Sequence, residues 1–318
     1  MAEFAPILVT AFNRPERLEE LLTSISDLGT RIYVALDAAK IGDQVNIEKV
    51  ERCKTVIRRF ETRITETRIA EHNQGCYLGV SSAIDWAFGL EEVLIILEDD
   101  IRFDSKFVNF ATDMLEIYRD EIEVSGISSM NLVPTEMQSD PQNAYRFSMF
   151  TSSWGWATWR NRWVDFVHSM EPFEGSITDW PNNYWDFWRV RYWTNIFDAV
   201  RAGEGDSWAY RWQYTNWLHR RLTIVPNANL SLNRGYAENA THTKDQRPPW
   251  WLPNEILDLQ EYQMHPLPVV RDSKADSRME EIHYRMKPMQ QVRNLARRRF
   301  PRMVGNIRRY FPLKPDKT

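Results

Sequence analysis

The stretch Val93-Leu94-Ile95-Ile96-Leu97-Glu98-Asp99-Asp100 decides the fold and places the candidate site. Five apolar residues without alternation predict a strand buried on both faces, as in a parallel sheet. Three adjacent carboxylates repel one another and are costly to desolvate, so packing alone does not account for them. Oxygen ligands suit Mg²⁺ or Mn²⁺, and open α/β sheets bind ligands at the carboxyl ends of strands. The stretch predicts a metal–nucleotide site; the alternative is an acidic helix-capping turn.

Strands and helices alternate on both sides of this stretch. Strands are predicted at residues 6–12, 31–36, 63–70, 93–97 and 124–129, with helices starting at Pro15 and at residues 45–60, 77–88 and 107–118. This alternation predicts an α/β fold with a mostly parallel, doubly wound sheet. Beyond about residue 140 aromatic residues become frequent, and helices are predicted at residues 186–202 and 208–221.

The composition is that of an ordinary globular protein, with 43% hydrophobic and 26% charged residues among 318. No segment approaches the roughly 20 apolar residues of a membrane span. The first residues, Met1 to Phe4, lack the features of a signal peptide, and two cysteines, Cys53 and Cys76, do not form a disulfide framework. We therefore expect a cytoplasmic protein.

Asp37 follows the second predicted strand and is a candidate ligand for the base or ribose of a nucleotide. The alternative is a helix cap or a solvated loop acid. No Gly-x-Gly-x-x-Gly follows the first strand, and no Gly-Lys-Ser/Thr occurs. Dinucleotide-binding folds and phosphate-loop NTPases are therefore disfavoured.

The order of these motifs carries a resemblance to a known family. Asn13-Arg14-Pro15 follows the first strand, Asp37 the second, and Glu98-Asp99-Asp100-Ile101 precedes Trp154-Gly155-Trp156-Ala157-Thr158-Trp159. This pattern resembles GT-A-fold, nucleotide-sugar-dependent glycosyltransferases, in particular a bacterial family-2-like group. It is more distantly similar to N-acetylglucosaminyltransferase I. The resemblance covers roughly residues 6–243.

The resemblance implies a donor site in the first half of the chain. Asp100 corresponds to the ligand of Mn²⁺ or Mg²⁺ that bridges the donor diphosphate, with Asp99 near the ribose and Glu98 in support. Asp37 corresponds to the acid that contacts the nucleobase. The remaining donor-side residues that the resemblance implies are Arg14, Asn73 and Gly75, and His242 would complete the metal or diphosphate site.

The segment that carries the family's general base is where this chain departs from the pattern. The segment Gly205 to Trp212 resembles one in which an Asp precedes Trp-Asp-Tyr-Gln-Trp, but Ala209 replaces the second Asp and Arg211 replaces the Gln. Asp206 is therefore the first candidate for the base that deprotonates the acceptor hydroxyl, and Asp186 is the second. The alternative for both is a helix cap or a surface acid.

The tryptophan-rich segment at residues 152–163 is predicted to be a loop that walls the site. Trp154 and Trp156 would offer flat faces to a sugar, and Gly155 would allow the backbone to approach closely. The alternative is that these rings fill space between the sheet and the helices.

The C-terminal residues 285–318 carry 11 Lys/Arg against one acid, which leaves 29 basic and 43 acidic residues in the rest of the chain. Apolar residues share a helical face there, so the pattern predicts a basic amphipathic anchor for an anionic membrane surface. A solvated tail is the alternative. No motif indicates nucleic-acid binding.

These observations divide the chain into a nucleotide-sugar-binding half at residues 1–140, an acceptor-side half of the same domain at 141–250, and a C-terminal extension at 251–318. The expected activity is metal-dependent hexosyl or N-acetylhexosaminyl transfer, with inversion, from a nucleotide sugar (a UDP-sugar is favoured). The acceptor would be a glycan or lipid-linked glycan in surface polysaccharide or lipopolysaccharide assembly.

Two other functions remain open. The first is a catalytically silent glycan-binding or scaffold protein, which the replacement at Ala209 suggests. The second is a nucleotidyltransferase, which is disfavoured because residues 11–15 do not form the glycine-rich basic loop that such enzymes need after the first strand.

Overall fold

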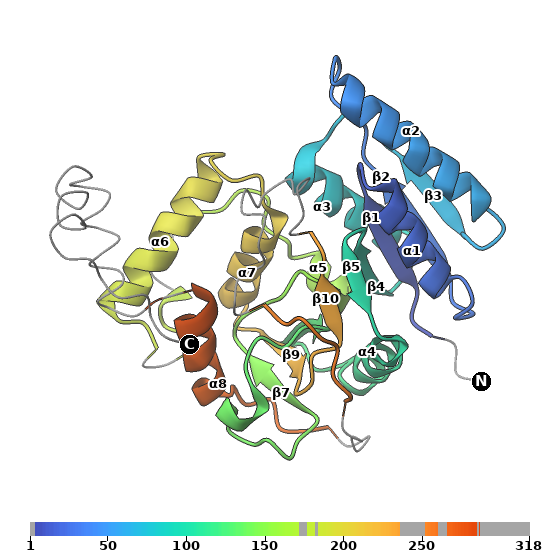
Figure 1. The fold of residues 1–318 in the computed structure, drawn as a ribbon. Helices are drawn as coiled ribbons and strands as arrows, with labels where there is room; N and C mark the ends of the chain where they lie inside the picture. The colour runs from blue at the N-terminus through green and yellow to red at the C-terminus, as the bar shows by residue number, and fades with distance from the viewer. Residues whose placement is uncertain are drawn as a thin grey trace, which may run out of the picture.

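The computed structural model describes residues 4–171, 177–181, 184–235, 252–259, 266–284 and 286. Within these residues the chain forms one eight-stranded sheet and a separate two-stranded ribbon, with helices on both faces of the sheet (Figure 1). The first half contributes β1 (Ile7–Ala11), α1 (Pro15–Ile25), β2 (Ile32–Leu36), α2 (Gln44–Arg59), β3 (Glu66–Ile69), α3 (Gly75–Phe88), β4 (Val93–Glu98), β5 (Ile101–Phe103), α4 (Ser105–Ile117) and β6 (Val124–Ser128). The second half contributes η1 (Thr135–Met137), β7 (Tyr145–Ser148), β8 (Trp156–Trp159), α5 (Arg160–Trp163), α6 (Phe187–Arg201), α7 (Trp208–Leu218), β9 (Leu222–Pro226), β10 (Ser231–Asn233), α8 (Ser273–Met279) and η3 (Glu280–Tyr284).

The strand order is β3-β2-β1-β4-β8-β6-β9-β7. The first four strands are parallel, and β6 also pairs in parallel with β9. β8 runs antiparallel to both of its neighbours, β4 and β6, and β7 is antiparallel to β9. The predicted mostly parallel α/β sheet is therefore confirmed, with two antiparallel strands that the simple alternation of strand and helix did not indicate.

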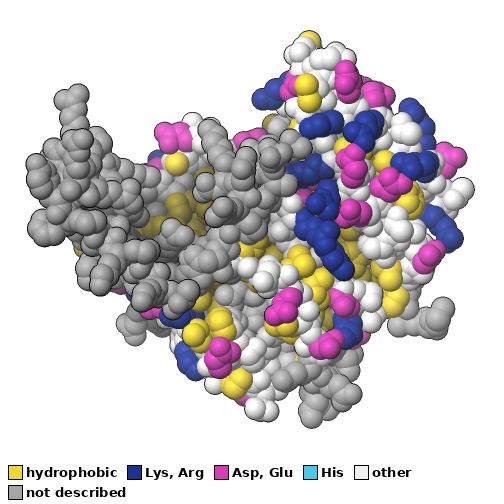
Figure 2. All heavy atoms as spheres, in the orientation of Figure 1, with side chains coloured by type: hydrophobic (Ala, Val, Ile, Leu, Met, Phe, Trp, Pro, Cys, Tyr) yellow, Lys and Arg dark blue, Asp and Glu magenta, His cyan; other side chains and the backbone are white. Residues whose placement is uncertain are grey.

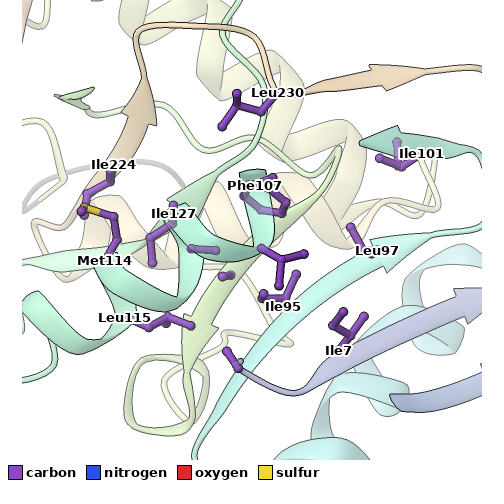
Figure 3. Close-up of a cluster of buried hydrophobic side chains, with 14 of the residues drawn as sticks. Ile7, Ile95, Leu97, Ile101, Phe107, Met114, Leu115, Ile127, Ile224 and Leu230 are labelled. Carbon is purple, nitrogen blue, oxygen red and sulfur yellow. The ribbon is translucent and has the colours of Figure 1, made fainter. Parts of the chain in front are cut away.

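Alternate residues of the central strands enter two different apolar clusters. Ile7, Val9 and Ile95 belong to the first cluster, which α1, α2 and α4 cover; Leu8 and Ile96 belong to the second, which α3 covers. Figure 3 shows the first cluster, with Ile95 and Leu97 of β4 close to Phe107 of α4. Burial on both faces explains why β4 reads as a continuous apolar run.

The helix periodicity is confirmed where it was strongest. In α1 the buried residues are Pro15, Leu18, Leu21, Leu22 and Ile25, which is one face of a helix that begins at a proline. In Figure 1, α1 and α2 lie side by side, and α6 and α8 lie at the opposite end of the molecule.

The tryptophan-rich segment is not the loop that the sequence predicts. Trp156–Trp159 is strand β8, inserted between β4 and β6, and Arg160–Trp163 is a short helix. The insertion joins the two halves of the chain in one sheet. Trp156, Thr158 and Trp159 are residue types that favour a strand, and the glycine at 155 turns the chain into it.

In the part of the chain that the structure describes, no helix is long and apolar enough to cross a membrane. The basic segment predicted as a membrane anchor lies almost entirely outside the described residues.

Candidate nucleotide-binding site

A cavity of about 540 Å³ opens at the carboxyl ends of the parallel strands. The chain order makes this position the switch point of the sheet: β2 and β3 lie on one side of β1, and β4 lies on the other. Ligands of open α/β sheets bind at such crevices. The cavity wall includes Phe12, Arg14, Asp37, Asn73, Gly75, Glu98, Asp99, Asp100, Trp154, Asp206, Asn233 and Gly235.

The acidic triplet meets the segment that follows β1. Arg14 Nη1 donates to Asp99 Oδ1 at 2.8 Å and to Asp100 Oδ2 at 3.0 Å, and the Phe12 backbone N–H donates to Asp99 Oδ2 at 3.1 Å. Burial would lower the pKa of Arg14, but the carboxylates of Asp99 and Asp100 raise it above its ordinary value. Arg14 therefore stays protonated and places a positive charge beside the acidic triplet.

The other two acids of the triplet are held with raised pKa values. Burial, with the charges of Asp100 and Asp99, raises the pKa of Glu98 to about 8, against a hydrogen bond from Trp208 that lowers it. Burial raises the pKa of Asp100 to about 6, although Arg14 opposes the shift. Carboxyls with raised pKa values in a cavity are typical of functional sites.

Asp100 has the donor atoms that a hard cation needs. Its Oδ1 is buried and, among the described residues, has no hydrogen-bond partner. A buried carboxylate oxygen without a partner is costly, and a cation would remove that cost. Mg²⁺ is commonly bound by one or two carboxylates together with substrate phosphates, so Asp100 and Glu98 fit such an ion. No group of three or more His, Cys, Asp or Glu arranged for a metal occurs within the described residues.

Asp37 is tied to the loop in front of α3. Its carboxylate accepts hydrogen bonds from the Gln74 N–H (2.9 Å), the Gly75 N–H (3.2 Å) and Asn73 Nδ2 (3.1 Å). Burial raises the pKa of Asp37 although these backbone donors oppose the shift. Asp37 and Asn73 therefore shape the cavity wall together, as a unit that links the end of β2 to the start of α3.

Asp206 continues the same arrangement from the other side. Its two oxygens accept the N–H groups of Cys76 at 2.7 Å and Tyr77 at 2.9 Å. Four consecutive N–H groups, from Gln74 to Tyr77, are thus held by two carboxylates. The helix α3 leaves these donors unpaired, and Asp206 acts as a cap supplied by a distant segment.

Gly75 makes this contact possible. Its φ is +74°, and a Cβ there would lie 2.6 Å from Asp206 Oδ2. Any larger residue would be strained and would displace the Asp206 carboxylate. The expectation that Gly75 borders the cavity agrees with the structure, and the close neighbour that requires the glycine is Asp206.

The two tryptophans of the predicted wall lie in different surroundings. Trp154 lines the cavity, and its ring is edge-on to the His283 ring, with the ring centroids 6.3 Å apart. Trp156 is 3% exposed and stacks on Trp208 with ring centroids 5.4 Å apart. The expectation that Trp156 offers a free face to a sugar is wrong, because β8 turns alternate side chains into the core. Gly155, at φ +82°, backs onto Ser129, where a Cβ would lie 2.6 Å from Oγ.

Asp186 does not reach the cavity. It is the N-cap of α6: it accepts the N–H groups of Trp188 and Arg189 at 2.9 Å and pairs with the Arg189 guanidinium. The structure gives Asp186 the role of its cap alternative, and its assignment as a second candidate base stays a prediction. His242 lies outside the described residues.

Several cavity residues were not singled out from the sequence. They are Lys40, Asp43, Asn46, Arg68, Asn233 and Gly235. Gly235 is packed so closely against Asp100 Oδ2 that a Cβ would collide with it. In the sequence, Gly235 is marked by the polar turn that follows β10. In the structure, the Arg234 N–H donates to the Asp100 carbonyl at 2.9 Å, which holds this turn against the acidic triplet.

Comparison with known proteins gave matches among solved structures alone. No family model matches the chain, and no curated protein matches it. Residues covering 74% of this chain match TarS 1-349 of S. aureus with 12% identity and a TM-score of 0.42, and the chain spans 61% of that protein's length. The same protein in complex with UDP matches with 15% identity over 52% of this chain and 48% of that one, at a TM-score of 0.34.

A further similar structure is the mannosyltransferase PcManGT from Pyrobaculum calidifontis in complex with GDP-Man and Mn²⁺. It matches with 11% identity over 69% of this chain and 70% of its own, at a TM-score of 0.37. The fold assignment made above rests on the sheet of this chain itself.

Proposed function

We propose that this chain is a metal-dependent glycosyltransferase that uses a nucleotide sugar. One observation carries the proposal: Asp100, with a buried, unpartnered Oδ1, lies beside Arg14 in a cavity at the switch point of a mostly parallel sheet. Asp100 supplies a carboxylate that can bind a cation, and Arg14 supplies a permanent positive charge, at the position where such sheets bind nucleotides. The order of motifs in the sequence supports the same activity.

The diphosphate of the donor would lie at Arg14 and Asp100. Asp100, with Glu98 beside it, would hold a Mn²⁺ or Mg²⁺, which would supply positive charge to the departing nucleoside diphosphate. The Arg14 guanidinium offers further donors to phosphate oxygens, since the hydrogen bonds assigned to it within the described residues all use Nη1. Glu98, which also lines the cavity, would add negative charge beside the bound cation.

The nucleoside would occupy the wall formed by the ends of β2 and β3. Asp37 holds Asn73 and the N–H groups of the following residues, so this wall is preorganised before a ligand enters. A rigid wall lowers the ordering cost of binding. UDP-sugars are the favoured donors in this proposal, with the sugar toward Trp154.

Asp206 is the proposed base. Its carboxylate lines the cavity opposite the acidic triplet, and each oxygen that accepts an N–H keeps a second lone pair. In that position it would accept the proton of an acceptor hydroxyl, as an inverting transfer requires. The acceptor would be a glycan or lipid-linked glycan of surface polysaccharide or lipopolysaccharide.

The proposal extends to location and organisation. Residues 1–140 would bind the donor, residues 141–250 the acceptor, and the basic residues of 251–318 would hold a cytoplasmic enzyme on an anionic membrane surface. His242 would contribute to the metal or diphosphate site.

A catalytically silent scaffold is the second candidate, because both Asp206 oxygens already hold α3 and Ala209 stands where the resemblance expects an acid. The rate at which sugar is released from UDP- and GDP-sugars with Mn²⁺, measured for the wild type and Asp100→Ala, distinguishes the enzyme from the silent scaffold. Turnover that falls at least about a hundredfold in Asp100→Ala supports the enzyme. An equal background rate in both proteins would exclude it.

A further inference from the structure

Two acids of the triplet, Asp99 and Asp100, share one cation from the chain itself. Arg14 Nη1 is shared between Asp99 Oδ1 and Asp100 Oδ2, at 2.8 and 3.0 Å, and the side chain is only 21% exposed. Asp99 has a second partner in the Phe12 N–H. For Asp100, Arg14 is the charged group in direct contact, so the two carboxylates depend on Arg14 to different degrees.

A second cation on Asp100 would lie close to the Arg14 guanidinium. Arg14 and Gly235 both lie against Oδ2, and Oδ1, the other oxygen of the same carboxylate, is buried. A guanidinium and a divalent cation on one buried carboxylate repel each other strongly, because such a site screens charge poorly. A metal that binds Asp100 therefore competes with Arg14.

Arg14 is able to leave without disturbing the fold. It is the residue before α1, where Pro15 fixes the helix start and the Arg14 carbonyl accepts the Leu18 N–H at 2.9 Å. Its side chain makes no cap hydrogen bond to the helix and lines the cavity. Rotation of the side chain would move the guanidinium from Asp100 toward the cavity without a change in the backbone contacts of α1.

The neighbouring arginines do not share this position. Arg17 pairs with Glu20 at 3.0 Å, and Arg234 approaches the same carboxylate at 3.6 Å. Figure 2 shows acidic and basic side chains interspersed over the face that carries α1 and α2. Arg17 therefore offers a matched control: a cation one turn along the same helix, outside the cavity lining.

We propose that Arg14 is a displaceable counter-ion: it occupies Asp100 in the free protein and turns to the diphosphate when a nucleotide binds, which opens Asp100 to the divalent cation. The proposal rests on the proposed function for its ligands. Nucleotide and metal binding are then coupled through Arg14, and each promotes the other by the same factor.

The test measures Mn²⁺ and UDP separately, by electron paramagnetic resonance of free Mn²⁺ and by calorimetry of UDP in chelator. In Arg14→Met, Mn²⁺ alone binds about tenfold tighter or more, because its competitor is gone, while UDP alone binds about tenfold weaker, because a charged donor is lost. Opposite signs in one variant are not produced by misfolding. Arg14→Lys keeps the charge and stays within about threefold of the wild type for Mn²⁺.

Two controls assign the effect. Arg17→Met, which keeps the Arg14 contact, changes the affinity for Mn²⁺ far less than Arg14→Met does, because Arg17 acts on Asp100 only at a distance. Asp100→Asn in the Arg14→Met background removes the gain. An affinity for Mn²⁺ alone that is unchanged or weaker in Arg14→Met overturns the proposal, as does an equal gain in Arg17→Met. Failure of UDP to bind any variant would count against the proposed function, while the Mn²⁺ measurements still decide the role of Arg14.

Discussion

Replacement of Gly75 by alanine tests the contact that joins α3 to the segment before α7. Gly75 has φ +74°, and an added Cβ would lie 2.6 Å from Asp206 Oδ2. Gly42 is the matched control, since it has φ +85° and nothing within 4 Å of an added Cβ. Both substitutions carry the cost of a left-handed alanine, about 1 kcal/mol. The collision occurs at Gly75 and is absent at Gly42.

The additional cost at Gly75 follows from the hydrogen bonds that Asp206 loses when it moves. The Asp206 carboxylate accepts hydrogen bonds from the N–H groups of Cys76 and Tyr77, and both bonds are exposed to solvent. At about 0.5–1.5 kcal/mol for each bond, Gly75→Ala should cost about 2–4 kcal/mol in total. In an Asp206→Ala background the collision is gone, and Gly75→Ala should cost about 1 kcal/mol, as Gly42→Ala does.

The assay is urea unfolding followed by tryptophan fluorescence. The wild type, Gly75→Ala, Asp206→Ala, the double variant and the Gly42→Ala control are all measured at one pH. The expected coupling between positions 75 and 206 is about 1–3 kcal/mol. Equal costs of Gly75→Ala in the two backgrounds would refute the assignment of Asp206 as the residue that holds the start of α3.

Three further outcomes are expected. Because burial raises the pKa of Glu98 from 4.5 to about 8, protonated Glu98 stabilises the folded protein without metal, fully below about pH 4.5, and this stability is lost as the pH rises through about 8. The melting temperature should fall over that window, and Glu98→Gln should flatten the fall. An identical slope in the two proteins would contradict the burial of the Glu98 carboxyl. Asp186→Ala should cost about 1 kcal/mol as a lost helix cap and leave sugar transfer unchanged; a large loss of turnover would restore Asp186 as a base. Trp154→Ala should raise KM with little change in unfolding, whereas Trp156→Ala should cost about 3–5 kcal/mol as a core truncation; the reverse order would contradict the placement of the two rings.

The periodic part of the chain was predictable from the sequence. The apolar residues of α1 recur at helical spacing, so they are buried on one face of a helix. The apolar run of β4 does not alternate with polar residues, so it is buried on both faces of the sheet. The position of the acidic triplet follows from the same reasoning, since the residues after a parallel strand lie at the ligand-binding edge.

The partners of those residues were not predictable. Asp206 meets Gly75 across 131 positions of sequence, and no local pattern indicates that its carboxylate caps α3. Strand β8 was missed because a short run rich in tryptophan is equally compatible with a loop wall and a buried strand. The separation of Trp154 from Trp156 follows from β8 pairing between β4 and β6, which is long-range information.

The most direct test of the nucleotide site is the melting temperature of the wild type and of Asp100→Asn with UDP, GDP, dTDP and CMP, each with and without Mn²⁺. A ligand at about one hundred times its Kd stabilises the folded state by about 2.7 kcal/mol, which is readily measured. We predict that one nucleotide raises the melting temperature of the wild type, that Mn²⁺ increases this rise, and that Asp100→Asn loses the increase due to Mn²⁺. No rise with any nucleotide, or an equal Mn²⁺ effect in both proteins, would contradict the account.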